Sequence, residues 1–339
     1  MSGLVPPGMK VITAGEVRKH LEAGREDCVD LVRRAYLAHH RGDSTLPHSS
    51  FLRFPHRARD RVIALPGYLG GEFEVAGIKW ISSWPGNTGH GLPRASAVMV
   101  LNDLATGFPF ACLESSLISA ARTAASGVLA AELLAGGRTA ARVGFVGTGL
   151  IADQVSRFLT DLGWRVSGYR LFDLDRAAAD RFAARLTARG GTDVEVVEEA
   201  GAAFGGCDLV VLATVAGEPH LHDPALLAHS PVVLHLSLRD LAPELILGAQ
   251  NLTDDADHVL RENTSLDLAA RLAGRRDFLD GTIADLIEGR VARDRTRAAV
   301  FSPFGLGVLD LAVGQWIHQR CERAGEGRSV PDFHEGTGL

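Results

Sequence analysis

The sequence predicts an α/β fold whose main part is a doubly wound parallel sheet, joined to a second, α+β domain. The first observation is a series of short apolar runs, such as residues 143–146 and 166–172, with the length of buried parallel strands. The second is that amphipathic segments, such as residues 150–162 and 175–189, lie between these runs. The third is a glycine-rich turn directly after the first run.

This turn, Gly147-x-Gly149-x-x-Ala152, connects the strand at residues 143–146 to a helix that begins near Leu150. Gly147 permits the tight turn, Gly149 lets backbone N–H groups approach a pyrophosphate, and the small Ala152 lets the helix pack closely on the strand. The context predicts a Rossmann-type dinucleotide site. The alternative is a glycine turn in an α/β protein that binds no cofactor.

The choice of dinucleotide depends on the end of the second strand, where Asp173 follows residues 166–172. An acid at this position binds the ribose hydroxyls of the adenosine and repels a 2′-phosphate. We therefore expect NAD in preference to NADP, although Arg176, three residues later, weakens that preference.

Composition restricts the class of protein. The 339 residues are 46% hydrophobic and carry a formal net charge of −6, which argues against nucleic-acid and anionic-membrane partners. No signal-like segment opens the chain and no charge-free stretch has membrane-spanning length, so we expect a cytoplasmic protein. The four cysteines form no C-x-x-C pattern, and we expect reduced thiols and no metal site.

The first part of the chain predicts the α+β domain. Thr13-x-x-Glu16 is a capping box for a first helix, and residues 27–39 form a second. Runs at residues 62–65, 77–82 and 97–102 predict an antiparallel sheet. An Ala-rich helix over residues 117–134 follows, and a last helix over residues 308–323 precedes a polar, glycine-rich end.

Four charged residues are candidates for binding or catalysis. Arg53 either points into a pocket or is solvated on an edge strand, and Lys79 either reaches water or binds an anion. Arg122 lies among alanines, which favours an anionic ligand. Asp240 follows the run at residues 232–236, at the edge of the sheet where ligands bind, but it could also cap the helix near residue 242.

Several segments together resemble the ornithine cyclodeaminase and mu-crystallin family of oxidoreductases. They are Lys79-Trp80 with Trp84-Pro85-x-Asn87, residues 98–107, Ser119-Ala120-Ala121-Arg122-Thr123-Ala124-Ala125, the Gly147 turn and Asp240. The resemblance implies a homodimer with a substrate-binding and dimerisation domain at residues 1–140 and 306–325, an NAD-binding domain at residues 141–305, and a tail at residues 326–339.

The resemblance also implies roles for individual residues. Positions Arg53, Lys79 and Arg122 hold the substrate carboxylate in this family, and Asp240 handles protons. The cofactor contacts implied are Arg122, Thr123, Gly147, Thr148, Gly149, Leu150, Ile151, Asp173, Thr214, Ser237, Leu238 and Phe304.

Within the family, residues 78–83, 235–244 and 301–307 are similar to N-(2-amino-2-carboxyethyl)-L-glutamate dehydrogenases. The similarity implies NAD-dependent oxidative hydrolysis to 2,3-diaminopropionate, 2-oxoglutarate and NADH, in siderophore or peptide biosynthesis. Arg94 adds a cation for a substrate with three carboxylates. Arg94 and residues 241–243 depart from the cyclodeaminase pattern, which counts against ornithine. The alternatives are a cyclodeaminase or ketimine reductase, and a ligand-binding protein of the mu-crystallin type.

Overall fold

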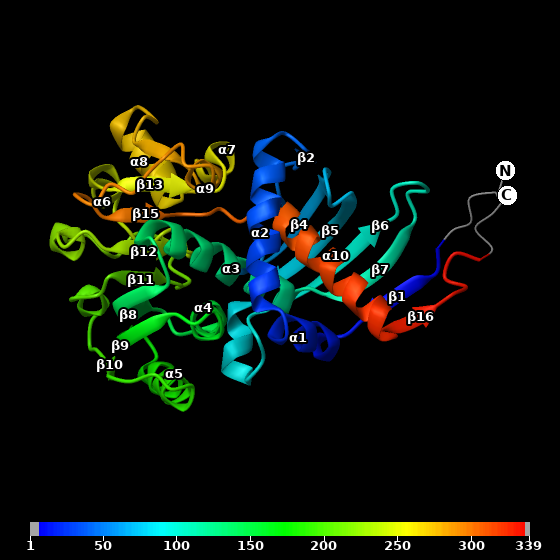
Figure 1. Ribbon diagram of the computed structural model, residues 1–339, viewed down its shortest axis with the longest axis horizontal. Coiled ribbons are helices and arrows are strands. Elements are labelled where there is room, and N and C mark those ends of the chain that lie inside the picture. Colours follow the sequence, from blue (N-terminus) through cyan, green and yellow to red (C-terminus); the bar gives the residue numbers. More distant parts are fainter. Residues whose placement is uncertain (1–6, 336–339) are drawn as a thin grey trace. The chain divides into compact units, whose positions relative to one another are not determined.

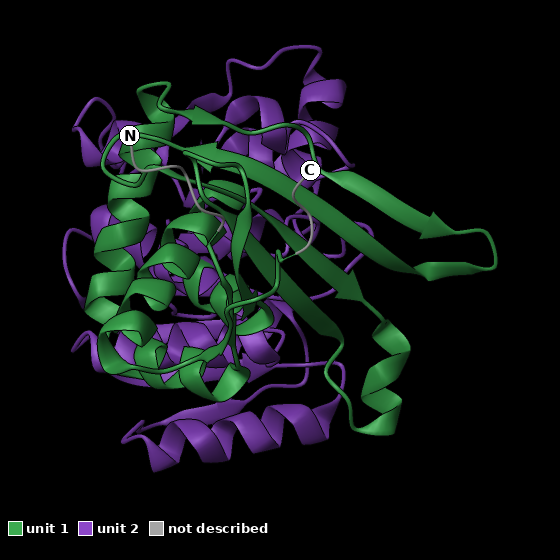
Figure 2. Ribbon diagram, turned by 90° about the vertical axis from the view of Figure 1, so that its right-hand side faces the viewer, with its two compact units in different colours: residues 1–122, 306–339 green, residues 123–305 purple. Residues whose placement is uncertain are grey.

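The computed structural model describes residues 7–335, which fold into two compact units (Figure 1). Unit 1 comprises Met1–Arg122 and Leu306–Leu339, and unit 2 comprises Thr123–Gly305 (Figure 2). The division falls inside helix α3 (Ser116–Ala135), whereas the sequence led us to place it near residue 140. Arg122 and Thr123, which are adjacent in α3, are thus assigned to different units.

The sheet of unit 1 is mostly antiparallel, as the runs between residues 62 and 102 predict. Its strand order is β16-β1-β7-β6-β5-β4-β2, with β3 paired to β4. The strands are β1 (Met9–Ile12), β2 (Ser44–Thr45), β3 (Ser50–Phe54), β4 (Arg57–Leu69), β5 (Val75–Ser83), β6 (Ala95–Asn102), β7 (Pro109–Glu114) and β16 (Arg328–Val330). The 3-10 helix η1 (Pro85–His90) joins β5 to β6.

Three helices of unit 1 pack on one face of this sheet: α1 (Ala14–Glu22), α2 (Arg25–His40) and α10 (Gly307–Ala324) (Figure 1). The predicted Thr13 and Glu16 capping box is present at the start of α1. Helix α10 crosses the sheet closely, because Gly314 leaves room only for the side chain of Met99. Met99 lies opposite Lys79 in the β5–β6 register, so Lys79 also faces α10.

The end of the chain differs from the sequence prediction. We expected a tail from residue 326 onward, but β16 pairs antiparallel with β1 and extends the sheet of unit 1. Strand β16 is only three residues long, and its polar, glycine-flanked sequence carries no strand pattern that would distinguish it from a loop.

Unit 2 has a fully parallel sheet in the order β10-β9-β8-β11-β12-β15-β13-β14, which confirms the predicted doubly wound fold. Its strands are β8 (Thr139–Val146), β9 (Arg165–Phe172), β10 (Val194–Val196), β11 (Leu209–Leu212), β12 (Val232–His235), β13 (Gln250–Thr253), β14 (Leu279–Thr282) and β15 (Ala299–Phe301).

The helices of unit 2 besides α3 are α4 (Leu150–Asp161), α5 (Arg176–Ala188), α6 (Pro243–Gly248), α7 (Ala256–Val259), α8 (Ser265–Ala273) and α9 (Ile283–Ile287), with the 3-10 helices η2 (Gly201–Phe204) and η3 (Pro224–Leu227). The helical segment between residues 256 and 273 is divided into α7 and α8, because Glu262 and Asn263 adopt left-handed φ angles of 56° and 55° and Thr264 caps a new start.

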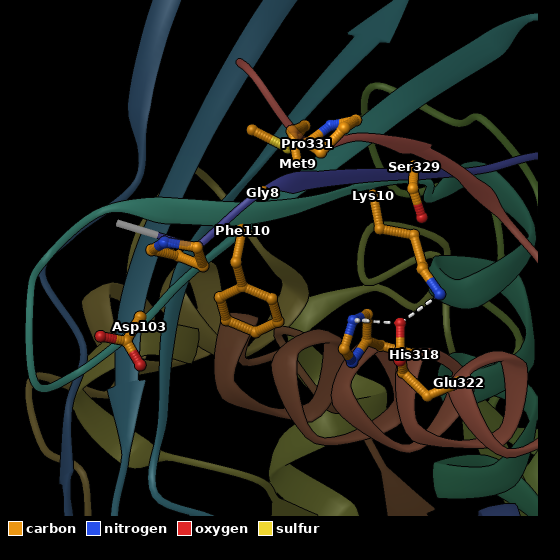
Figure 3. Close-up of a pocket in the computed structure, with 10 residues that line it drawn as sticks. Gly8, Met9, Lys10, Asp103, Phe110, His318, Glu322, Ser329 and Pro331 are labelled. Carbon is orange, nitrogen blue, oxygen red and sulfur yellow. Dashed lines mark ion pairs between the residues drawn. The ribbon is translucent and has the colours of Figure 1, made fainter. Parts of the chain in front are cut away.

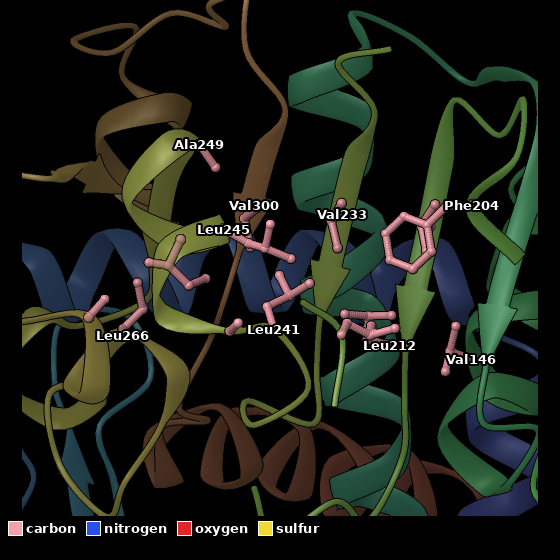
Figure 4. Packing of buried hydrophobic residues seen from close by; sticks show 14 of the residues in the cluster. Val146, Phe204, Leu212, Val233, Leu241, Leu245, Ala249, Leu266 and Val300 are labelled. Carbon is pink, nitrogen blue, oxygen red and sulfur yellow. The ribbon is translucent and has the colours of Figure 1, made fainter. Parts of the chain in front are cut away.

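The apolar runs form the core of unit 2, as Figure 4 shows. Side chains from four neighbouring strands, among them Val146, Leu212, Val233 and Val300, form one side of this core. They pack against Leu241 in the loop before α6, Leu245 in α6 and Leu266 in α8. Burial of such side chains contributes roughly 1.5–3 kcal/mol each to folding. This packing fixes the carboxyl ends of β8, β11 and β12, which carry the predicted site residues of unit 2.

Helix α3 is long and apolar enough by composition to cross a membrane, but 72% of that stretch is buried inside the protein. A Cβ placed on Gly127 would lie 3.4 Å from the Leu234 side chain and 3.5 Å from the Leu236 side chain, so the glycine lets the helix pack closely on both. These are properties of the core helix of a globular domain.

Candidate functional site

The glycine turn of unit 2 has the geometry of a dinucleotide-binding turn. Gly147 has a φ of 87°, and a Cβ there would lie 2.6 Å from the carbonyl oxygen of Ala213, so a larger residue is excluded. A Cβ on Gly149 would meet no atom within 4 Å, and Gly149 provides no side-chain cap for α4. The first N–H groups of α4, at Leu150 and Ile151, therefore lack a side-chain cap, which fits a pyrophosphate.

Asp173 lies at the end of β9 and is bonded to this turn. Its Oδ2 accepts hydrogen bonds from the Thr148 backbone N–H at 2.7 Å and from the Thr148 hydroxyl at 2.8 Å. Arg176, which we expected to weaken the preference for NAD, donates to Asp180 at 3.0 Å and to Glu198 at 2.7 Å. Two carboxylates thus already neutralise the cation that a 2′-phosphate would need.

Asp240 is completely buried just after β12, where its carboxylate accepts several hydrogen bonds. Thr214 and Ser237 donate their hydroxyls to it, and His220 Nε2 lies 3.1 Å from Oδ1. Burial raises the pKa of Asp240, but the bonds with His220 and His235 outweigh it and hold the pKa well below its usual range. Helix α6 has Ala242 as its N-cap and no side-chain cap, so Asp240 does not cap it.

His235 and Leu238 complete the surroundings of this carboxylate. His235 is fully buried; its Nε2 lies 3.1 Å from the Asp240 backbone nitrogen and 3.3 Å from Asp240 Oδ2, and its Nδ1 lies 3.2 Å from Ser302 Oγ. Leu238 has a φ of 69°, a backbone conformation that residues other than glycine rarely adopt. The tight bend after β12 brings Ser237 back onto Asp240.

The sequence reasoning missed both histidines. His235 interrupts the apolar run of β12 at its carboxyl end, the same signal that drew attention to Asp240 five residues later. His220 lies in the loop after β11 and has no sequence signal, because only the fold brings it to Asp240. Its backbone N–H also donates to the Asp240 carbonyl, at 3.0 Å.

The remaining predicted cofactor residues of unit 2 are spread along its sheet edge. Thr214 follows β11; its hydroxyl oxygen accepts a hydrogen bond from the Ala216 N–H at 3.1 Å and donates its proton to Asp240. The Phe304 N–H donates to the buried Asp254 at 2.8 Å. Thr123 lies in α3, near the start of the segment of that helix that belongs to unit 2.

In unit 1, Lys79 and Arg122 meet at a buried carboxylate that the sequence reasoning missed. Lys79 Nζ lies 2.7 Å from Asp310 Oδ2 and 3.1 Å from Ser119 Oγ, and Arg122 Nε lies 3.2 Å from the same Asp310 oxygen. The signal for Asp310 is an acid in an otherwise apolar first turn of the last helix, Gly-Val-Leu-Asp-Leu-Ala-Val. Lys79 therefore does not reach water, contrary to one of its two interpretations.

We call Lys79, Arg122 and Asp310 the buried ion cluster. It holds two cations and one anion, a net charge of +1. Burial and the neighbouring Arg122 lower the pKa of Lys79 to about 8, although Asp310 opposes them. Among the described residues, Asp310 Oδ1 and Arg122 Nε have no partner in good hydrogen-bond geometry. A net positive, incompletely bonded site of this kind favours an anionic ligand.

Arg53 and Arg94 lie apart from this cluster. Arg53 is exposed on β3 with its guanidinium over the ring of Phe51, 5.1 Å from the centroid. Arg94 is half-buried before β6 and donates to Ser83 Oγ at 2.8 Å. Of the four predicted substrate cations, only Lys79 and Arg122 share a contact through Asp310.

Two other features of unit 1 hold none of the predicted site residues. A pocket of about 490 Å³ lies beside β1, lined by Phe110, His318 and Glu322 among others (Figure 3). His20, Cys321 and Glu326 have ligand atoms within 4.8 Å of one another, the arrangement of a possible metal site. Glu326, however, already bonds Lys19 and His20, and burial raises the pKa of the Cys321 thiol to about 11.

Known proteins resemble the chain over nearly its full length. Residues 9–325 match the ornithine cyclodeaminase/mu-crystallin family. An N-((2S)-2-amino-2-carboxyethyl)-L-glutamate dehydrogenase of Staphylococcus aureus is 28% identical over 89% of this chain and 92% of its own. An alanine dehydrogenase of Archaeoglobus fulgidus is 26% identical over 95% of this chain and 98% of its own.

Solved structures agree with the fold. The crystal structure of CmnK superimposes with a TM-score of 0.85 at 29% identity, covering 95% of this chain and 98% of that one. A Thermococcus litoralis Δ1-pyrroline-2-carboxylate reductase, solved with NADH and L-proline, gives a TM-score of 0.87 at 22% identity, covering 95% and 100%. Because the family match spans most of the described residues, this chain belongs to the ornithine cyclodeaminase/mu-crystallin family.

Proposed function

We propose that the protein is an NAD-dependent amino-acid dehydrogenase that oxidises a CH–NH bond. Its substrate in this proposal is N-(2-amino-2-carboxyethyl)-L-glutamate, and its products are 2,3-diaminopropionate, 2-oxoglutarate and NADH. The observation that carries the proposal is the net positive charge of the buried ion cluster, which favours a carboxylate ligand. The dehydrogenase from Staphylococcus aureus, similar over most of both chains, supports the choice of substrate.

The residues of unit 2 fit the cofactor. The uncapped start of α4 and the open space at Gly149 suit a pyrophosphate, and Asp173 suits the ribose hydroxyls. When bound, NAD supplies the two-electron acceptor that takes the Cα hydrogen as hydride. Thr214, Ser237 and Leu238 border the same end of the sheet, where ligands of parallel sheets bind.

The buried ion cluster would hold the substrate by its α-carboxylate. Arg122 offers a planar donor pair and Lys79 a point charge, and together they would fix the direction of the Cα hydrogen. In Arg122→Leu, Lys79 and Asp310 remain as an ion pair with no net charge. The fold should therefore persist, while the net positive charge of the cluster is lost.

Proton transfer is the task of the Asp240 and His220 pair. The substrate nitrogen must lose a proton before its lone pair can expel the hydride from Cα. We expected Asp240 itself to take this proton, but its oxygens already accept bonds from Thr214, Ser237 and His220. His220 is the more exposed member of the pair, with 37% of its side chain accessible. In this proposal His220 takes the proton, and Asp240 stabilises the imidazolium that results.

The oxidised substrate is an iminium, and water adds to its carbon. Once His220 has released its first proton to solvent, it can accept a proton from that water. His220 then returns this proton to the nitrogen of the adduct. The carbon–nitrogen bond breaks, the nitrogen leaves as the amine of 2,3-diaminopropionate, and the hydroxyl loses its proton as the carbon becomes the ketone of 2-oxoglutarate. Two electrons leave the substrate, and one NADH accounts for them. The product would serve siderophore or peptide biosynthesis in the cytoplasm.

We also propose a homodimer formed through the sheet of unit 1. Four large apolar side chains on the sheet face opposite Lys79 are 37–48% exposed, namely Val11, Leu52, Trp80 and Val98. Exposed apolar residues gathered on one sheet face favour a partner, and a second copy of this face is self-complementary.

The direct test is turnover by the purified protein with NAD and three amino acids: the proposed substrate, alanine and ornithine. Nicotinamide absorbance and product analysis should identify the N-linked glutamate derivative as the substrate. Arg122→Leu should lower its turnover about 10-fold to 100-fold, since a charge-assisted bond contributes about 1.5–3 kcal/mol. Faster turnover of alanine or ornithine would refute the choice of substrate. Unchanged kinetics of Arg122→Leu would refute the role of Arg122.

A further inference from the structure

A second group of cations lies on the sheet of unit 1, away from the buried ion cluster. Arg61 in β4 lies directly opposite Ser83 in β5, and Arg94 donates to Ser83 Oγ at 2.8 Å. The two guanidinium groups are close enough to affect one another, since burial and the charge of Arg61 lower the pKa of Arg94. The sequence reasoning selected Arg94 but not Arg61.

These two arginines have no carboxylate partner among the described residues. Arg94 bonds only the neutral Ser83 in the described part of the chain, and Arg61 has neither a hydrogen bond nor an ion pair there. By contrast, Arg297 pairs with Asp280 and Asp294. Two half-buried like charges without a counter-ion are unfavourable in the free protein, and an anion bound between them would remove that cost.

The position of this pair relates it to the substrate. The β4–β5 register runs without a break from Arg61 opposite Ser83 to Leu65 opposite Lys79, so both cationic groups face the same side of the sheet. Four residues of strand separate Lys79 from Ser83, about 13 Å along the backbone. Long arginine side chains shorten the gap that a ligand must span.

We propose that Arg61 and Arg94 form a second carboxylate-binding site that selects substrates with an acidic arm. This inference rests on the proposed function, in which the buried ion cluster holds the α-carboxylate. The distal carboxylate of the glutamyl part would lie between the two arginines. Alanine has no group for this site, and the distal ammonium of ornithine would be repelled by it.

Binding of keto acids separates this inference from turnover. The protein with NADH is titrated with 2-oxoglutarate, which has the distal carboxylate, and with 2-oxobutyrate, which lacks it. Arg61→Gln and Arg94→Gln should each weaken 2-oxoglutarate binding at least about tenfold, the effect of one lost charge-assisted bond, and change 2-oxobutyrate binding little. Arg57→Gln, which removes an exposed arginine of the same strand, is the matched control and should change neither.

Equal losses for both keto acids, or no loss for either, would overturn the second site. Thermal unfolding is the accompanying measurement. Removal of one unneutralised charge should leave the melting temperature of the free variants unchanged or higher, and 2-oxoglutarate should raise it less than in the unmodified protein. If the Arg-dependent preference for 2-oxoglutarate is found without turnover, the site stands and the proposed function fails. If the glutamate derivative is turned over but this preference for 2-oxoglutarate is not found, the proposed function stands and the second site fails.

Discussion

If Lys79 binds the substrate carboxylate as we propose, its burial makes substrate binding depend on pH. Its pKa is lowered to about 8, so the amine loses its charge as the pH rises through 8, well before an exposed lysine would. The attraction for a carboxylate is lost with that charge. We predict that the KM for the substrate rises above pH 8, while Lys79→Arg, which stays charged, lacks this rise.

Ionisation of the substrate's own amines changes KM equally in both proteins, because both act on the same substrate. The difference between the two pH profiles therefore reports Lys79. Steady-state kinetics between pH 6 and 10 provide the measurement. If Lys79→Arg shows the same rise in KM as the unmodified protein, Lys79 is not the titrating group.

In the proposed mechanism, Asp240 positions His220, and the His220 imidazole exchanges the proton. Asp240→Asn should lower kcat about 100-fold or more and retain NAD binding, since the amide no longer stabilises an imidazolium. His220→Gln should lower kcat to a similar degree and leave KM largely unchanged. The activity lost in His220→Gln should be partly restored by added imidazole. Full kcat in His220→Gln would show that Asp240, and not His220, accepts the proton.

At the scale of single residues, the sequence indicated Lys79 and Arg122 because each is a charge among apolar neighbours, and Asp240 because it follows a strand at the edge of the sheet where ligands bind. It did not indicate Asp310, His220 or Arg61. Asp310 lies more than two hundred residues from Lys79 along the chain, and the contact exists only because α10 returns to the first sheet. Arg61 sits among several arginines of one strand, and only the register identifies the one opposite Ser83.

We propose that the turn between β8 and α4, together with Asp173, sets cofactor choice. Asp173 contributes negative charge near the expected ribose and also bonds Thr148. Asp173→Asn removes the charge but keeps an oxygen that can accept the Thr148 bonds. We predict that this variant narrows the preference for NAD over NADP about tenfold, because the repulsion of a 2′-phosphate is lost.

Asp173→Ala is the matched comparison, since it removes both the charge and the bonds to Thr148. It should weaken binding of both dinucleotides in addition to narrowing the preference. Isothermal titration with each dinucleotide measures both effects. Tighter binding of NADP than NAD by the unmodified protein would contradict the assignment of Asp173.

At the scale of elements, long periodic segments and clear apolar runs were predictable, including the four-residue strand β12, whereas short strands without such a run were not. The strands β8 and β9 and the helices α4 and α5 occur where apolar periodicity placed them. Strands β13 (Gln250–Thr253) and β14 (Leu279–Thr282) have mostly polar sequences, and β15 has only three residues, so none of them shows a recognisable strand pattern. Their position in the parallel sheet follows from neighbouring strands rather than from local sequence.

For the whole molecule, the exposed face of the first sheet predicts association. Light scattering should give a mass near twice 36.1 kDa. Trp80→Glu together with Val98→Glu should weaken the dimer on the order of 100-fold, because charges would face an apolar interface. Leu272→Glu, at an exposed apolar position on α8 of unit 2, is the control and should not affect the dimer. A monomer in the unmodified protein would contradict the proposed interface.

The fate of the hydride tests the central claim most directly, because it distinguishes the reactions supported by one scaffold. A cyclodeaminase returns the hydride to its cyclic imine, so NAD is regenerated and ammonia accumulates. A dehydrogenase that loses its iminium to water leaves NADH behind. With N-(2-amino-2-carboxyethyl)-L-glutamate, we predict one NADH and one 2-oxoglutarate for each substrate molecule consumed. Formation of proline and ammonia from ornithine without net NADH would contradict the proposed function.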